Sequence, residues 1–174
     1  MCYFVRNFLT QSQRQIMNTT EPISDYELER GKPMPSLNHS VLQANLSTIL
    51  QNLYRKDFTF ASELSISLAD KPFVPDLCIY PKRKIDWQND EIRVSEPPLT
   101  IIEISSPKQD FEDFEHKLKA YFNAGVKSFW LLIPFTETLT IFYPNEKPVS
   151  FTTGEAVDKT NGIKLNVDEL FSTE

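Results

Sequence analysis

The sequence predicts an α/β (α+β) fold, a mixed β-sheet flanked by helices within a single domain. Two stretches, residues 36–56 and 108–124, carry apolar residues at helical spacing. Between and after them lie short apolar runs bounded by proline, glycine and polar residues, which are typical of strands. The length of 174 residues and the hydrophobic content of 40% suit one domain with a buried core.

The first half of the domain is predicted to hold one helix and two strands. The helix is "SLNHSVLQANLSTILQNLYRK", with Ser36 or Asn38 as its capping residue. Residues 58–68 follow, with alternating apolar side chains that indicate a strand. Residues 71–81 read as a second strand with proline near both borders, and residues 81–96 as a polar loop.

The second half begins with a third strand, residues 99–105, which is more apolar and therefore more buried. The helix at residues 108–124 has one apolar stripe, and Gly125 is placed to end it. The strand "SFWLLIP" then lies parallel to the third strand after a right-handed crossover. We expect one more strand at "TLTIFYP" and a short final element at "GIKLNVDELF".

The N-terminal segment is interpreted as a tail, residues 1–20, preceding the domain at residues 21–174. It is mildly apolar but lacks the hydrophobic segment and the small-residue cleavage site of a signal peptide. Met17 stands just before the globular pattern begins, so one hypothesis is that translation starts there.

Composition limits the function classes. The formal net charge of −6 argues against broad nonspecific attraction to nucleic acid. "PKRK", residues 81–84, is either a solvated loop or, with Arg93 and Lys108, a local path for a phosphate backbone. No apolar run is long enough to span a membrane. Cys2 and Cys78 show neither a metal-binding nor a disulfide pattern, which fits a reducing compartment, and we expect a cytoplasmic protein.

Two acidic residues interrupt neighbouring predicted strands. Period two places Glu103 on the face of Ile101 and Ser105, and Asp76 on the face of Cys78. If the strands pair and these faces agree, the two carboxylates converge. Carboxylates held together repel each other, and Mg²⁺ removes that repulsion because it binds one or two carboxylates with phosphate and water. The alternatives are that Asp76 bonds local backbone N–H groups and that Glu103 forms only an ion pair.

Lys117 is the lysine of the second helix that is best aimed along the edge of the sheet. It lies on the flank of the apolar stripe and shares that flank with Asp113, one turn earlier. Near a carboxylate–metal cluster it could orient a water or stabilise developing phosphorane charge. The alternative is a surface salt bridge with Asp113, which contributes little.

The chain resembles the Uma2 family, also called DUF820, which is abundant in cyanobacteria and is similar to PD-(D/E)XK nucleases. The resemblance rests on "VPDLCIYP", "LTIIEISSP" and "DFEHKLKAYFNAGVKSFWLLIP" in that order, and it runs from about Tyr26 to Phe171. It implies a restriction-endonuclease-like fold. The individual pieces are short, and their order and spacing together carry the specificity.

The resemblance also implies roles for individual residues. Asp76 is the aspartate of the PD motif, Glu103 is the acid of the second half-motif, and the backbone carbonyl of Ile104 is a further metal ligand. Ser105 stands where the nuclease pattern has lysine, and Lys117 is the candidate replacement.

The first helix and its flank offer supporting residues. The first helix lacks the supporting acid of many such nucleases and offers His39 and Gln43 instead, while Glu29 lies just upstream. His39 is otherwise interpreted as a capping or packing residue. Tyr121 either closes the core beside Lys117 or supports the site.

The resulting expectation is a Mg²⁺- or Mn²⁺-dependent endonuclease that hydrolyses nucleic acid, in particular DNA, through Asp76, Glu103 and Lys117. The rival is a catalytically inactive binding or assembly protein on the same fold, because fold alone does not decide function. A subunit of a toxin-like or mobile-element system is a third possibility. We expect a homodimer, with the Phe129–Trp130 strand and "IFYP" as candidate interface.

Overall fold

The computed structural model describes residues 35–105 and 111–172, and the elements below belong to one compact unit, Ser36–Glu174. The tail boundary at residue 20, Met17 and Glu29 lie outside the described residues. The elements are α3 (Leu37–Tyr54), β1 (Phe58–Ser62), β2 (Ile66–Leu68), β3 (Lys71–Phe73), β4 (Leu77–Pro81), β5 (Thr100–Ile104), α4 (Phe111–Asn123), β6 (Ser128–Ile133), the 3₁₀ turn η1 (Pro134–Thr136), β7 (Thr138–Phe142), β8 (Val149–Phe151), β9 (Glu155–Val157), β10 (Lys164–Asn166) and α5 (Val167–Phe171).

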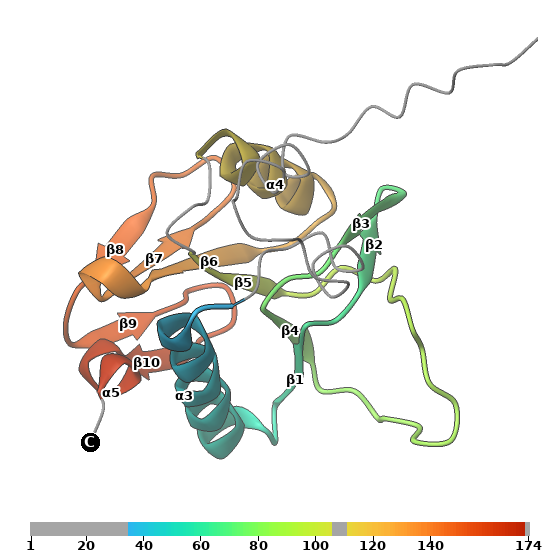
Figure 1. Cartoon of the computed structure of the whole chain (residues 1–174). Coiled ribbons are helices and arrows are strands. Elements are labelled where there is room, and N and C mark those ends of the chain that lie inside the picture. Colours follow the sequence, from blue (N-terminus) through green and yellow to red (C-terminus); the bar gives the residue numbers. More distant parts are fainter. Residues whose placement is uncertain (1–34, 106–110, 173–174) are drawn as a thin grey trace, which may run out of the picture. The chain divides into compact units, whose positions relative to one another are not determined.

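The main sheet is mixed, as the sequence predicts (Figure 1). Within the described residues it has six strands in the order β1-β4-β5-β6-β7-β8. β5 and β6 are parallel and joined through α4, and the other neighbouring pairs are antiparallel. The parallel pair places the carboxyl ends of β5 and β6 at the same edge of the sheet, beside the amino end of β4.

Two predicted long strands are each divided. Residues 58–68 leave the sheet after β1 at Glu63, whose φ of 54° lies in the left-handed region. β2 and β3 then form a separate hairpin through Ala69 and Asp70, both with positive φ, as tight hairpin turns require. The alternation in "LSISL" therefore does mark a strand, β2. This strand pairs with β3 instead of extending β1.

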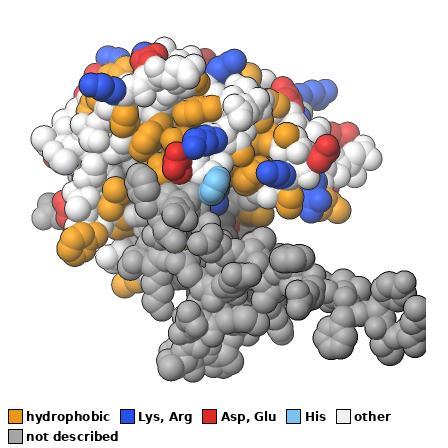
Figure 2. Space-filling view, turned by 90° about the horizontal axis from the view of Figure 1, so that it is seen from above, with side chains coloured by type: hydrophobic (Ala, Val, Ile, Leu, Met, Phe, Trp, Pro, Cys, Tyr) orange, Lys and Arg blue, Asp and Glu red, His pale blue; other side chains and the backbone are white. Residues whose placement is uncertain are grey.

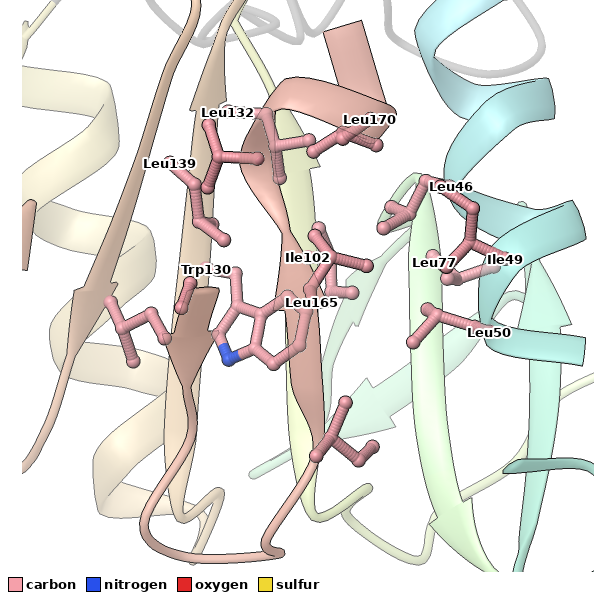
Figure 3. Packing of buried hydrophobic residues seen from close by; sticks show 14 of the residues in the cluster. Leu46, Ile49, Leu50, Leu77, Ile102, Trp130, Leu132, Leu139, Leu165 and Leu170 are labelled. Carbon is pink, nitrogen blue, oxygen red and sulfur yellow. The ribbon is translucent and has the colours of Figure 1, made fainter. Parts of the chain in front are cut away.

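One face of the sheet packs against α3 and the C-terminal elements (Figure 3). Side chains from α3, from the centre of the sheet and from β10 and α5 meet there in one apolar cluster. Figure 3 shows Trp130 reaching from β6 toward Leu165, with Ile102 beside it. Full burial of a Leu or Ile side chain contributes roughly 1.5–3 kcal/mol to folding, and α3 places Leu42, Leu46, Ile49 and Leu50 in this cluster, which anchors the helix to the sheet.

The opposite face packs against α4 and the β2–β3 hairpin. Phe114 and Tyr121 lie on the buried stripe of α4 and contact Phe129 of β6, with ring centroids 5.4 and 5.8 Å apart. Gly125 follows the helix with φ of 101°, and its N–H bonds the carbonyl of Phe122, as predicted for the helix end. The stripe and its end fix which α4 side chains face the sheet edge.

The prediction that Phe129 and Trp130 form a dimer interface is wrong, because both side chains are buried within one chain. Phe129 is 0% and Trp130 1% exposed within a single chain. Trp130 is covered by the C-terminal elements, and its indole N–H donates to Asp158 at 2.8 Å. An apolar run covered on both faces by its own chain has the same sequence pattern as one covered by a partner.

None of the helices formed by residues 35–105 and 111–172 combines the length and the apolar character that crossing a bilayer requires.

Candidate active site at the ends of β4 and β5

Strand register brings Asp76 and Glu103 to the same place. Leu77 pairs with Ile102 in the antiparallel β4–β5 ladder. Continuing that register by one residue places Asp76, which immediately precedes β4, opposite Glu103 near the end of β5. Directly opposed residues of an antiparallel pair have neighbouring side chains on one face. Both acids are buried, with side chains 4% and 5% exposed.

Asp76 is held by donors from α3 and from β5. Its Oδ2 accepts hydrogen bonds from the N–H of Ile104 at 2.7 Å and from Nε2 of His39 at 3.2 Å. Its backbone carbonyl accepts from the Gln43 side chain at 3.1 Å. Ser36 caps α3 by accepting from the His39 N–H, which fixes the first turn that carries His39, and Gln43 follows one turn later.

Glu103 is held from the α4 side. Its Oε1 accepts from the Tyr121 hydroxyl at 3.0 Å and from the Lys117 ammonium at 3.3 Å. Lys117 and Tyr121 are one turn apart on α4, so both reach the same strand position. A buried carboxylate requires this kind of charged and hydrogen-bonded partner, because desolvation without one is costly.

Tyr121 remains a hydrogen-bond donor over the ordinary pH range. The pKa of its phenol lies well above the usual value, first because the side chain is buried and then because the Glu103 carboxylate is nearby. Its ring is clamped by Phe73 and Phe129, at centroid distances of 5.0 and 5.8 Å. The hydroxyl is thus fixed in place by packing as well as by its bond to Glu103.

Lys117 pairs with Glu103, whereas the sequence left open a pair with Asp113. The Asp113 side chain lies outside the described residues, so that pair stays untested. Lys119, on the opposite flank of α4, bonds Glu115 at 2.6 Å at the surface. Lys117 itself is 29% exposed, so its ammonium lies between buried Glu103 and solvent.

Glu63 is a neighbour of the site that sequence reasoning missed. Ser62 pairs with Leu77, so the same register continued by one residue sets Glu63 opposite Asp76. Its N–H donates to the Asp76 carbonyl at 3.2 Å. A non-glycine residue with φ of 54° costs about 1–3 kcal/mol and is often found beside functional groups. The sequence alone does not place Glu63 near Asp76, because this proximity depends on the pairing of β1 with β4.

Ser105, where the nuclease pattern has lysine, directly follows β5 and is half-buried. Its N–H donates to the Leu132 carbonyl at 2.8 Å, which continues the β5–β6 pairing. The lysine nearest to Glu103 in the described part of the chain therefore comes from α4. The adjoining Ser106 and Pro107 lie outside the described residues.

Within the basic cluster at residues 81–84, acidic side chains compensate the charge of Arg83. Arg83 lies 3.5 Å from Glu96 and 3.9 Å from Glu91, and its guanidinium stacks over the Tyr80 ring at 5.1 Å. Lys82 donates to the Arg55 carbonyl. On the side drawn in Figure 2, described side chains of both charges are interspersed among hydrophobic ones, without a continuous basic area. Lys108 lies outside the described residues.

The oxygen donors at Asp76 and Glu103 fit a hard divalent cation. Mg²⁺ uses one or two carboxylates and completes its coordination with water and phosphate. Among residues 35–105 and 111–172, no cluster of three or more histidine, cysteine, aspartate or glutamate side chains is placed to bind one metal ion. Within these residues only two carboxylates come together, and carboxylates are the type of ligand that Mg²⁺ and Mn²⁺ use.

The six-stranded mixed sheet flanked by helices matches the fold of a solved protein. A crystal structure from Anabaena variabilis ATCC 29413, described as "a putative nuclease belonging to DUF820", has the same architecture. The two chains match with a TM-score of 0.70 over 80% of this chain and 83% of the other, at 22% sequence identity. At that identity the likeness shows the fold alone.

The family follows from a separate match. The model of the Uma2 family, described as "Putative restriction endonuclease", matches residues 14–168. The chain belongs to the Uma2 family, as the order of its motifs predicts. No curated protein matches the chain.

Proposed function

We propose that the protein is a metal-dependent endonuclease that hydrolyses phosphodiester bonds of DNA. The proposal is supported chiefly by the register that sets Asp76 opposite Glu103, with the Lys117 ammonium 3.3 Å from Glu103. The family description and the fold point in the same direction. Asp76, Glu103 and the Ile104 carbonyl would hold Mg²⁺ or Mn²⁺.

Each residue has a distinct task in this proposal. A cation bound there would polarise a phosphoryl oxygen and lower the pKa of a water molecule. Asp76, which directly precedes β4, and Glu103 in β5 would provide its oxygen ligands. Lys117 is anchored on Glu103 yet reaches solvent, so its ammonium can orient the attacking water and stabilise charge on the phosphate. Tyr121 keeps the Glu103 carboxylate in position.

The proposal predicts cleavage that depends on both a cation and Lys117. Plasmid and linear DNA incubated with Mg²⁺ or Mn²⁺ should be cut, cutting should stop with EDTA, and excess Mg²⁺ should restore it. Lys117→Met should slow cleavage by about 10²–10³-fold, as loss of one charge-stabilising donor does, while cation affinity is retained.

The matched control is Lys119→Met, because Lys119 lies on the same helix and forms only a surface pair with Glu115. This variant should cut DNA like the wild type. Cleavage that persists in EDTA, or equal rates for the two lysine variants, would contradict the assignment.

The second candidate is a noncatalytic member of the fold that binds nucleic acid or assembles with other proteins. The observation that favours it is the occupation of Glu103 by both Lys117 and Tyr121, with Ser105 in the usual lysine position. The acids flanking Arg83 also reduce the positive charge expected of a DNA groove. Retention of labelled DNA in a gel without cleavage, under all divalent cations, would favour this candidate.

A further inference from the structure

His39 is a buried histidine whose side chain points from the first turn of α3 toward the sheet edge. The residue is 6% exposed, and its backbone N–H is bonded to the capping Ser36 hydroxyl. Its ring Nε2 lies 3.2 Å from Oδ2 of Asp76. When the Asp76 carboxylate is ionised it can only accept hydrogen bonds, and the Nε2–H is then the donor. The contact therefore has a defined direction, from the imidazole to Asp76.

The other ring nitrogen of His39, Nδ1, reduces the stability of the folded state. His39 Nδ1 is buried and has no hydrogen-bond partner among the described residues. A buried polar atom without a partner destabilises the folded state, whereas an apolar side chain of similar size would avoid that penalty. A role limited to packing or to capping therefore does not explain an imidazole here, since the cap uses only its backbone N–H.

The Nε2–H contributes to a tight framework around Asp76. It shares Oδ2 with the Ile104 N–H, whose bond is 2.7 Å long. Gln43, one turn further along α3, holds the Asp76 carbonyl at 3.1 Å. The side chain and the backbone of Asp76 are thus both tied to the same face of α3. This arrangement fixes the orientation of the carboxylate before any ligand arrives.

We propose that His39 is the positioning residue of the Asp76 carboxylate and sets the affinity of the site for a divalent cation. The inference rests on the proposed function, because it requires that Asp76 binds the cation. A hydrogen-bond donor behind a ligating carboxylate fixes its orientation, and loss of such a partner weakens metal affinity about 10- to 100-fold. α3 thereby supplies a donor to the first acid, just as α4 supplies Tyr121 to the second.

The first test measures Mn²⁺ binding by calorimetry on the full chain. His39→Leu should weaken binding by about 10- to 100-fold, because the side chain keeps its bulk and loses its donor. His39→Gln should restore most of the affinity, because its amide N–H2 can reach Asp76 from the same backbone position. His116→Gln is the control, since His116 is the second of the two histidines and is exposed on α4.

The second test needs no variant. Because the chain has two histidines, ring-nitrogen NMR signals of tag-free wild type can be assigned to each. We expect a slowly exchanging Nε2 proton on buried His39, and we expect Mg²⁺ to shift the His39 signals saturably while those of His116 stay constant.

The outcomes separate this inference from the function on which it rests. Weakened binding in His39→Leu, rescue in His39→Gln and a Mg²⁺-dependent His39 shift support the inference. Wild-type affinity in His39→Leu, or unshifted His39 signals while calorimetry shows that the cation binds, overturns it and leaves the metal site standing. Absence of cation binding to the wild type overturns the proposed function and the inference together.

Discussion

Replacement of Glu103 by glutamine is expected to reduce DNA cleavage by about 100-fold or more. Loss of a residue that only supports a metal ligand lowers metal affinity or activity about 10- to 100-fold, and loss of the charged ligand itself should cost at least as much. The amide oxygen still accepts from Tyr121 and Lys117, the donors that reach Glu103 at 3.0 and 3.3 Å. Exchanging a buried carboxylate for a neutral amide also lowers the desolvation cost, so the free energy of unfolding should change by less than about 2 kcal/mol. The measurements are cleavage rates and urea unfolding of both proteins.

Glu115→Gln is the matched control. Glu115 lies on α4, its side chain is 55% exposed, and its bond to Lys119 is a surface pair. The pKa of its carboxyl is lowered by that lysine, so the control also removes a paired charge. Equal cleavage by Glu103→Gln and Glu115→Gln would assign Glu103 to the ion pair with Lys117 and remove it from the proposed chemistry.

Replacement of Asp158 by alanine is expected to destabilise the fold by about 3–5 kcal/mol, because several buried neutral donors lose their acceptor and each costs about 1–3 kcal/mol when left unsatisfied. Asp158 is 0% exposed. One carboxylate oxygen accepts from Ser128, from the Trp130 indole at 2.8 Å and from Asn161 at 3.1 Å. The other accepts twice from Thr160, each at 2.8 Å. Without Asp158, the Ser128 and Trp130 donors lose an acceptor in the core.

The expected fall in melting temperature is roughly 10 °C, given about 2–4 °C per kcal/mol for a protein of this size. Asp168→Ala is the control. That carboxylate also accepts bonds from Gly154 N–H and the Thr153 hydroxyl, which lower its pKa, but it lies at the surface. Its loss should shift the melting temperature far less. Similar shifts for the two variants in a thermal scan would contradict the role assigned to the Asp158 cluster.

The strand faces that carry Asp76 and Glu103 could be predicted because short-range rules determine them, whereas the pairing of the two strands remained a condition. Period two places Asp76 and Glu103 on defined strand faces, and antiparallel pairing of β4 with β5 then sets them opposite each other. The helical stripe of α4 likewise predicts that Tyr121 faces the core and that Lys117 lies on its flank. The choice of Glu103 as the partner of Lys117 depends on the distance between α4 and β5, which the sequence does not specify.

Other features depend on contacts between distant segments and therefore could not be predicted from the sequence. The Asp158 cluster joins residues from the starts of β5 and β6 to the turn before β10, and Asn161 also bonds Thr100 at 2.9 Å. No local motif marks such a cluster, because its members lie in three separated parts of the chain. The burial of Trp130 within a single chain was not predicted for the same reason. The C-terminal elements that cover it have only short, weakly patterned sequences.

The most direct test of the central claim is a Mn²⁺ titration of the wild type and of Asp76→Ala. If Asp76 and Glu103 form a cation site, the wild type binds Mn²⁺ saturably at one site and Asp76→Ala does not, while circular dichroism shows both proteins folded. If the wild type binds no Mn²⁺, or if folded Asp76→Ala binds it equally well, the paired carboxylates do not form a metal site and the account of a metal-dependent nuclease is contradicted.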